Sequence, residues 1–192
     1  MGKVVGVRKP AVTSVPIATL MAERWSPRAY DSSASVTDEQ ARALLEAARW
    51  APSFGNTQPA RYLVGVRGTP AFDGILATLN SGNRAWAHRA SLLLIGVMVT
   101  TNEKGDVPYA EYGLGLASEN LVRQPHPVRL LALDPPVLLP DDAVPKVAIA
   151  VGKPAEPDVL EEDWRIEREK ADRVRLPLEE FAFTGTWGEP AL

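Results

Sequence analysis

Apolar residues recur at helical spacing in the stretch that follows Thr37. The apolar face of this stretch consists of Ala41, Leu44, Leu45 and Ala48. Thr37 and Gln40 have the three-residue separation of a capping box, so we expect the helix to begin immediately after Thr37. Pro52 disfavours helical geometry before it, and the helix is therefore predicted to end near Trp50.

Five further stretches are predicted to be helical. They are a short helix opened by Pro16 with Ile17, Leu20 and Met21 on one face, a helix from Pro70 with Thr69 as its N-cap, one or two turns within residues 85–90, and helices over residues 109–124 and 161–170. Residues 80–83, of sequence Asn-Ser-Gly-Asn, are expected to form a loop.

Three stretches have the character of strands. Residues 61–66 and 146–151 are short and rich in β-branched or aromatic side chains, while residues 92–99 are continuously apolar. The last pattern predicts a central strand that is buried on both faces. Helices interleaved with strands indicate a layered α/β or α+β fold, as a single domain over residues 1–192. Residues 1–15 are expected to form an extended N-terminal arm.

Composition narrows the possible functions. The chain has 192 residues, 45% of them hydrophobic and 23% charged, and its net charge of −3 offers no basic field for nucleic acid or anionic lipid. It has no cysteine and only two histidines, His88 and His126, which lack metal-ligand spacing, so we expect no metal site. Residues 92–99 are too few to span a bilayer and the N-terminus lacks a signal-peptide pattern, which favours a cytoplasmic protein without a membrane partner.

Two basic clusters lie near opposite ends of the chain. Arg24 and Arg28 flank Ser26, and Arg173 and Arg175 are two residues apart. Guanidinium groups match phosphate oxygens bidentately, so two such pairs and a hydroxyl suit a phosphate-bearing ligand. The alternative is that these arginines belong to a solvated surface.

The second candidate is a proline-braced loop over residues 51–59. Asn56 and Gln58 in this loop offer amide donors and acceptors, which could recognise the alternating N–H and C=O edge of a flavin-like ring. Alternatively, the loop is a turn that ends the preceding helix, with both amides bonded to their own backbone.

Taken together, these motifs resemble the nitroreductase family of flavoproteins. The R-x-S-x-R element at residues 24–28, the A-P-S-x-x-N-x-Q-P element at 51–59 and the Asn-Arg-Ala-Trp sequence at 83–86 have the family's order and separation, and Arg-Val-Arg-Leu-Pro-Leu at 173–178 is similar to its closing basic motif. The resemblance covers residues 16–122 and 140–188.

The resemblance implies an α+β fold in α/β/α layers, with a mixed sheet flanked by helices. It also implies an interlocked homodimer, with one FMN in each of two clefts at the subunit interface. The residues implied to bind FMN are Arg24, Trp25, Ser26, Arg28, Ser53, Asn56, Arg173 and Arg175. The implied activity is hydride transfer from NAD(P)H through flavin N5 to a small organic acceptor such as a nitroaromatic or a quinone. FMN carries this chemistry, so no protein side chain is predicted to be catalytic. Another flavin reaction, such as dehalogenation or desaturation, and flavin binding without turnover are the alternatives.

The sequence departs from the family pattern in one segment that matters for the flavin. Residues 124–140 contain five prolines and do not match the family's strand and turn near flavin N5, so we expect an irregular, mobile loop there. Ala60 also replaces the tryptophan that often follows the family's Gln-Pro pair. Gly113 and Gly115 interrupt the helix predicted over residues 109–124, which suggests close approach of a partner helix or a flat ring.

Overall fold

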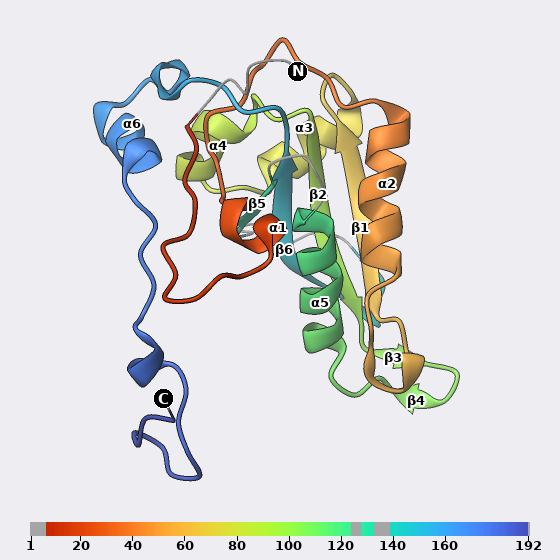
Figure 1. Ribbon diagram of the computed structural model, residues 1–192. Helices are drawn as coiled ribbons and strands as arrows, with labels where there is room; N and C mark the ends of the chain where they lie inside the picture. Colours follow the sequence, from red (N-terminus) through yellow and green to blue (C-terminus); the bar gives the residue numbers. More distant parts are fainter. Residues whose placement is uncertain (1–6, 124–127, 133–138, 192) are drawn as a thin grey trace.

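The centre of the fold is a four-stranded sheet. The computed structural model describes residues 7–123, 128–132 and 139–191. The strands lie in the order β1 (Ala60–Val66), β2 (Leu92–Val99), β6 (Ala143–Val151) and β5 (Val128–Leu131) (Figure 1). All three pairings are antiparallel, so the described residues of one chain do not contain the parallel pairing that a mixed sheet requires.

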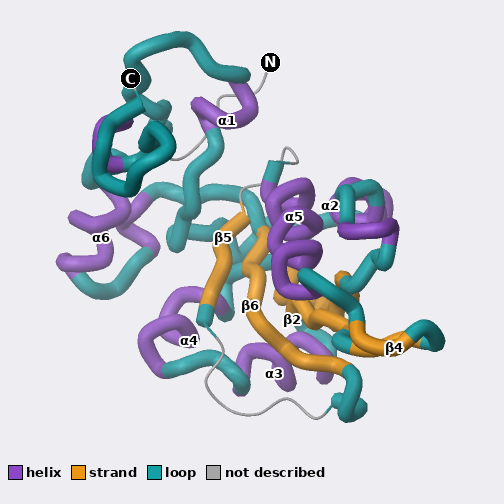
Figure 2. Tube along the Cα trace, turned by 90° about the horizontal axis from the view of Figure 1, so that it is seen from below, coloured by secondary structure: helices purple, strands orange, loops and turns teal. Residues whose placement is uncertain are grey.

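Helices cover both faces of this sheet, which confirms the three-layer α+β prediction. Helices α2 (Asp38–Arg49) and α5 (Ala110–Val122) pack on one face, and α3 (Pro70–Ala77) and α4 (Ser81–Ala87) pack on the other (Figure 2). Successive residues of β2 alternate between the two cores, with Leu92 and Leu94 on the α2 side and Leu93 and Ile95 on the α3 side. The continuously apolar sequence of β2 is therefore explained by burial on both faces.

Side-chain caps set the starts of three helices. Thr37 and Gln40 form the predicted capping box of α2, and Thr69 accepts a hydrogen bond from the backbone N–H of Phe72 at the start of α3. Asn80 caps α4 in the same way, with its Oδ1 2.8 Å from the backbone N of Asn83. The loop expected over residues 80–83 is therefore wrong, because a capping residue was interpreted as part of a turn.

The short helix α1 (Thr19–Glu23) begins three residues after the expected start at Pro16. Its predicted apolar face is exposed: Ile17, Leu20 and Met21 pack into neither core. Leu20 and Met21 lie in α1 as predicted, whereas Ile17 precedes the helix.

Strand β5 lies within residues 124–140, where the sequence predicted an irregular loop. This prediction is wrong over residues 128–131, which pair antiparallel with β6 from Val128 opposite Val151 to Leu131 opposite Ala148. Prolines prevent pairing only where they stand, and residues 128–131 contain none. The expectations for His126 and for the prolines at positions 125, 127, 135 and 136 fall outside the described residues.

The remaining elements are short. They are 3-10 turns η1 (Phe54–Asn56), η2 (Pro157–Val159) and η3 (Leu178–Glu180), the hairpin of β3 (Thr101–Asn102) and β4 (Gly105–Asp106), and helix α6 (Asp163–Lys170). Helix α6 and the tail after it lie to one side of the sheet, near α1 (Figures 1 and 2). None of the helices in the described part of the chain is both long and apolar enough to cross a membrane.

Candidate functional site

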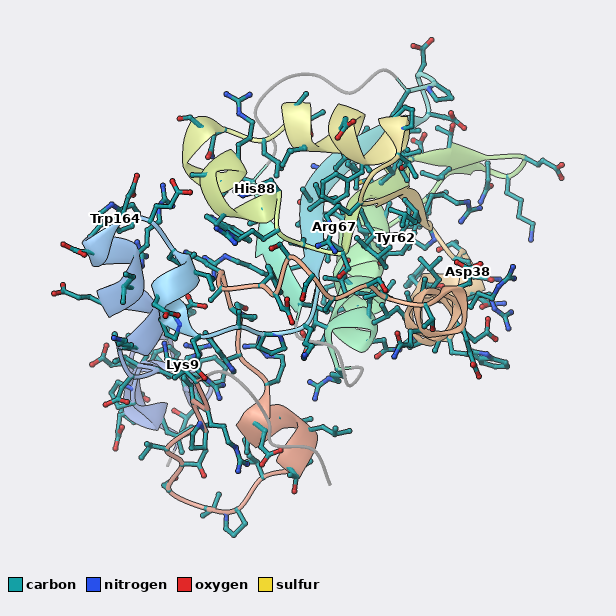
Figure 3. All side chains as sticks on the ribbon, turned by 90° about the horizontal axis from the view of Figure 1, so that it is seen from above. Lys9, Asp38, Tyr62, Arg67, His88 and Trp164 are labelled. Carbon is teal, nitrogen blue, oxygen red and sulfur yellow. The ribbon has the colours of Figure 1, made fainter. Side chains whose placement is uncertain are left out.

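The two ends of the sequence meet beside α1. The Lys9 ammonium donates a hydrogen bond to the backbone O of Glu169 at 2.8 Å, and Figure 3 shows Lys9 where the N-terminal segment meets α6 and the tail. Arg173 donates through Nη1 to the backbone O of Lys9 at 3.0 Å and of Ala22 at 2.7 Å. Contacts between residues about 150 positions apart therefore bring the two basic clusters of the sequence together.

Three of the predicted arginines form one positively charged group. Burial lowers the pKa of Arg24, the nearby Glu119 raises it, and Arg175 lowers it. The pKa of Arg173 is lowered first by burial and then by Arg24 and Arg175. Within the described residues, Arg24, Arg173 and Arg175 form no ion pair with a carboxylate, and Arg24 Nη1 instead lies 3.1 Å from Ser26 Oγ.

The fourth arginine of the prediction, Arg28, faces a different partner. Its Nη1 lies 3.6 Å from Oε2 of Glu169, whose side chain is 1% exposed. Oε1 of Glu169 also accepts hydrogen bonds from the backbone N–H groups of Arg28 at 2.6 Å and Ala29 at 2.9 Å. Burial lowers the pKa of Arg28, and Glu169 raises it. Arg28 is therefore partly neutralised within the chain.

Aromatic rings and a further arginine support the loop around Ser26. Arg129 on β5 donates through Nη1 to the backbone O of Ser26 at 2.8 Å and lies 5.5 Å from the ring centroid of Trp86. Burial lowers the pKa of Arg129 to about 10. The Trp25 ring lies 4.9 Å from the Lys9 ammonium, so Trp25 contacts the N-terminal segment. Trp86 belongs to the Asn-Arg-Ala-Trp sequence that contributed to the family resemblance.

The proline-braced loop lies elsewhere and has an unusual backbone. Asn56 and Gln58 have φ of 56° and 49°, and Gly55 has φ of 54°. All three lie in the left-handed region, which is unfavourable for residues other than glycine. Ser53 Oγ accepts from the Gln58 backbone N–H at 2.9 Å, and the Gln58 side chain donates to the Asn56 backbone O. No hydrogen bond of the exposed Asn56 side chain is found among the described residues, so this amide is available to a ligand.

A small cavity of about 80 Å³ adjoins this loop, lined in part by Ser53, Gln58, Pro59 and Gly113. A Cβ on Gly113 would lie 2.7 Å from Cγ of Pro59, so glycine is needed for the loop to approach α5. Gly115 is different, because a Cβ there would meet nothing within 4 Å. The two helical glycines predicted that another group would approach α5 closely. At Gly113 this group is the chain's own loop, whereas Gly115 lies on an open surface.

Helix α5 separates the two parts of the predicted site. Gly113 near its N-terminus contacts the loop. Near its C-terminus, Glu119 raises the pKa of Arg24 and Arg123 lowers it. The structure therefore groups Arg24, Ser26, Arg173 and Arg175, but it does not bring Ser53 and Asn56 to them within one chain. Sequence reasoning missed Glu169 and Arg129, since each belongs to an ordinary charged or apolar pattern and only the fold gives it a partner.

The chemistry of the grouped side chains suits a phosphate-bearing organic ligand. Three guanidinium groups without carboxylate partners repel one another, and an anion between them would remove that repulsion. A phosphate oxygen could replace the internal contact of Arg24 with the Ser26 hydroxyl. No group of three or more potential metal ligands is found among the described residues.

Comparison with known proteins gives three kinds of match. The sequence profile of the nitroreductase family matches residues 21–116. A 15.4 kDa protein from the ask 5′ region of Mycolicibacterium smegmatis is 29% identical over 147 residues, which cover 68% of this chain and 99% of that protein.

Two solved structures are also similar. The crystal structure of an oxidoreductase containing FMN superposes with a TM-score of 0.83 at 27% identity, over 93% of this chain and 96% of that one. A protein from Desulfovibrio desulfuricans in complex with FMN has a TM-score of 0.66 at 23% identity, over 91% and 99% of the two chains. The second likeness is one of fold.

Proposed function

This chain belongs to the nitroreductase family, and from that premise we propose that it is an FMN-dependent oxidoreductase. In this proposal it takes hydride from NAD(P)H and passes it to a small organic acceptor such as a nitroaromatic or a quinone, in a ping-pong sequence. A cytoplasmic location and a homodimer are part of the same proposal.

The observation that carries the proposal is the convergence of Arg24, Arg173 and Arg175 from opposite ends of the chain. Arg175 lowers the pKa of both Arg24 and Arg173, Arg24 lowers that of Arg173, and none of the three forms an ion pair with a carboxylate among the described residues. We assign the FMN phosphate to this group, together with the Ser26 hydroxyl. Each hydrogen bond from a charged donor contributes about 1.5–3 kcal/mol when well formed. The FMN in a similar structure of 27% identity supports the choice of ligand.

A homodimer would complete the site. Ser53 and Asn56 lie toward the N-terminal end of α5, and the arginines lie toward its C-terminal end. A two-fold axis across α5 makes the two copies of the helix antiparallel, which pairs the loop of one subunit with the arginines of the other. The open surface at Gly115 allows close approach of the partner, and the exposed apolar residues of α1 and the tail offer further contact area.

The chemistry that FMN supplies when bound is hydride acceptance and donation at N5, so the chain needs no nucleophile of its own. The chain's residues bind and orient. Arg28 would stabilise the negative charge that the pyrimidine edge gains on reduction. Asn56, whose amide has no described hydrogen bond in one chain, would hold the edge of the isoalloxazine ring in the partner's site.

An anaerobic titration tests the proposal. The purified protein, reconstituted with FMN, is mixed with NADH or NADPH while the absorbance of oxidised flavin is followed, and then with a quinone or a nitroaromatic. We expect rapid bleaching by at least one nucleotide and reoxidation by the acceptor. Bound flavin that neither nucleotide reduces would contradict turnover, and failure to bind FMN would contradict the whole proposal.

A further inference from the structure

Helix α6 carries one buried carboxylate, and the proposed chemistry does not use it. Glu169 is 1% exposed, whereas Glu167 on the same helix is exposed. Burying a charged side chain is unfavourable unless it is paired and hydrogen-bonded. The contacts of Glu169 therefore indicate the role of its buried carboxylate.

The first set of contacts holds the backbone that follows the R-x-S-x-R loop. One oxygen, Oε1, accepts from the N–H groups of both Arg28 and Ala29, at 2.6 and 2.9 Å. Two successive N–H groups directed at one carboxylate oxygen fix the local backbone direction. Helix α6 lies about 140 residues away in sequence, so this contact fastens the loop to the other end of the chain.

The second contact is one of charge. Oε2 finds no hydrogen-bond partner within the described part of the chain and lies 3.6 Å from Nη1 of Arg28. Among the described residues, Glu169 is the one carboxylate that raises the pKa of Arg28 and of Arg129, while Arg168 lowers both of these pKa values and Arg165 lowers that of Arg28. A single buried carboxylate therefore offsets the positive charge beside the loop.

We propose that Glu169 is a positioning residue of the flavin site, which holds the R-x-S-x-R loop in its binding shape and reduces the positive charge that Arg28 presents to the flavin. This rests on the proposed function, because FMN is the ligand of that loop. Glu169 acts through Arg28 and the backbone, and it does not contact the reacting atoms.

Two substitutions separate the two effects. Glu169→Gln keeps an oxygen that can accept from both N–H groups but removes the charge, while Glu169→Ala removes both. Glu167→Gln is the matched control, because it makes the same change at an exposed site of the same helix. Three quantities are measured: the FMN dissociation constant, the FMN midpoint potential, and amide exchange at residues 28 and 29 without FMN.

In Glu169→Gln we expect FMN to remain bound and the amides to remain protected. Reduced FMN should bind about tenfold more tightly relative to oxidised FMN, because a neighbouring negative charge is gone. For a two-electron couple this raises the midpoint potential by about 30 mV. In Glu169→Ala we expect FMN binding to weaken about tenfold or more, with faster exchange at both amides. Glu167→Gln should match the wild type.

A wild-type potential in Glu169→Gln overturns the charge role, even if the melting temperature falls. Wild-type FMN affinity and amide protection in Glu169→Ala overturn the clamp, by which we mean the proposed role of Glu169 in holding the R-x-S-x-R loop in its binding shape. If Glu169→Ala does not fold, Glu169→Gln still decides the charge role, since its potential is measured on folded holoprotein. If the wild type binds no FMN, it is the proposed function that fails, and amide exchange in the unliganded protein still tests the clamp.

Discussion

The sheet and the terminal region of this chain are stabilised in opposite ways. In the sheet, β2 and β6 are buried on both faces by apolar residues such as Leu93 and Ile149. In the terminal region, formed by residues 7–28, α6 and the tail, most of the large apolar side chains are exposed. Phe181 is 74% and Trp187 89% exposed, while the charged Glu169 is buried.

The difference shows that one chain alone can stabilise the sheet, whereas the terminal region depends on a ligand and on a partner surface. Apolar burial stabilises the sheet without any ligand. A region that exposes aromatic rings and groups three arginines that form no ion pair among the described residues needs an anion and an apolar surface to become stable. We therefore expect substitutions in the sheet to alter folding at any protein concentration, and substitutions in the terminal region to alter FMN binding or association.

The largest effect should come from the centre of the sheet. Leu93 is 0% exposed, so Leu93→Ala should lower the free energy of unfolding by about 2–5 kcal/mol, through lost burial and a cavity. Leu176 in the tail is 65% exposed and is the matched leucine. Any loss in Leu176→Ala should depend on protein concentration, because it would come from the subunit contact. Urea unfolding at two concentrations, tenfold or more apart, measures both; a concentration-independent loss of equal size in Leu176→Ala would remove the distinction.

The next effect concerns the arginine group. Arg24→Ala and Arg175→Ala should each weaken FMN binding by about 1.5–3 kcal/mol, since each removes a charged donor to the phosphate. Lysine at either position should restore only part of the affinity, because the planar fork is lost. Arg42 on the exposed side of α2 is the control, and Arg42→Ala should bind FMN as the wild type does. Fluorescence titration with FMN measures all the variants, and wild-type affinity in both alanine variants would exclude the assignment.

Helix α5 packs on the sheet, and its two glycines allow a smaller test. Gly113→Ala should destabilise the protein by about 1–3 kcal/mol, because its Cβ would meet Pro59 Cγ at 2.7 Å. Gly115→Ala places the same methyl group where the chain has no neighbour, so within one chain it should gain up to about 1 kcal/mol of helix propensity. Thermal unfolding gives the first value, and analytical ultracentrifugation shows whether Gly115→Ala also weakens the dimer. Equal stability of the two variants would contradict the described packing of the loop on α5.

The sequence predicted the sheet region better than the terminal region, for a physical reason. Capping at Thr37 and Thr69 and the apolar run of β2 are local signals that the structure confirms. Local signals failed where two interpretations share the same residues, as at Asn80, or where prolines on either side concealed a short strand at Val128–Leu131.

The candidate site was only partly predictable for a related reason. The motifs indicated Arg24, Ser26, Arg173 and Arg175, which the fold brings together across the whole chain. No periodicity identifies Glu169, because all six residues of its helix other than Trp164 and Ile166 are charged, and charge alone does not distinguish one of them from a solvated surface. Only the approach of Arg28 gives Glu169 a partner. Pairing between distant residues is a property of the fold, which a single sequence does not display.

The smallest expected effect on stability concerns Asp31 and Lys153, at the junction of the terminal region and the sheet. Asp31 donates its backbone N–H to Lys153 O at 2.9 Å, and its carboxylate accepts from Ser33 N–H and Oγ and lies 3.3 Å from Lys153 Nζ. The Ser33 hydrogen bonds, followed by Lys153, lower the pKa of Asp31 from 3.8 to about 2. Because the pKa is lower in the folded state, the ionised carboxylate stabilises the protein above pH 3.8, and this contribution is lost as the pH falls through 2.

Asp31→Asn isolates that contribution, since the amide oxygen can still accept from Ser33 while the charge is gone. The side chain is partly exposed and its ion pair is screened by solvent, so the substitution should cost about 1 kcal/mol or less at pH 7. Urea unfolding of both proteins between pH 7 and pH 2 should show the difference shrinking below pH 4 and vanishing near pH 2. A difference that persists at pH 2 would mean that the hydrogen bonds, and not the charge, join the terminal region to the sheet.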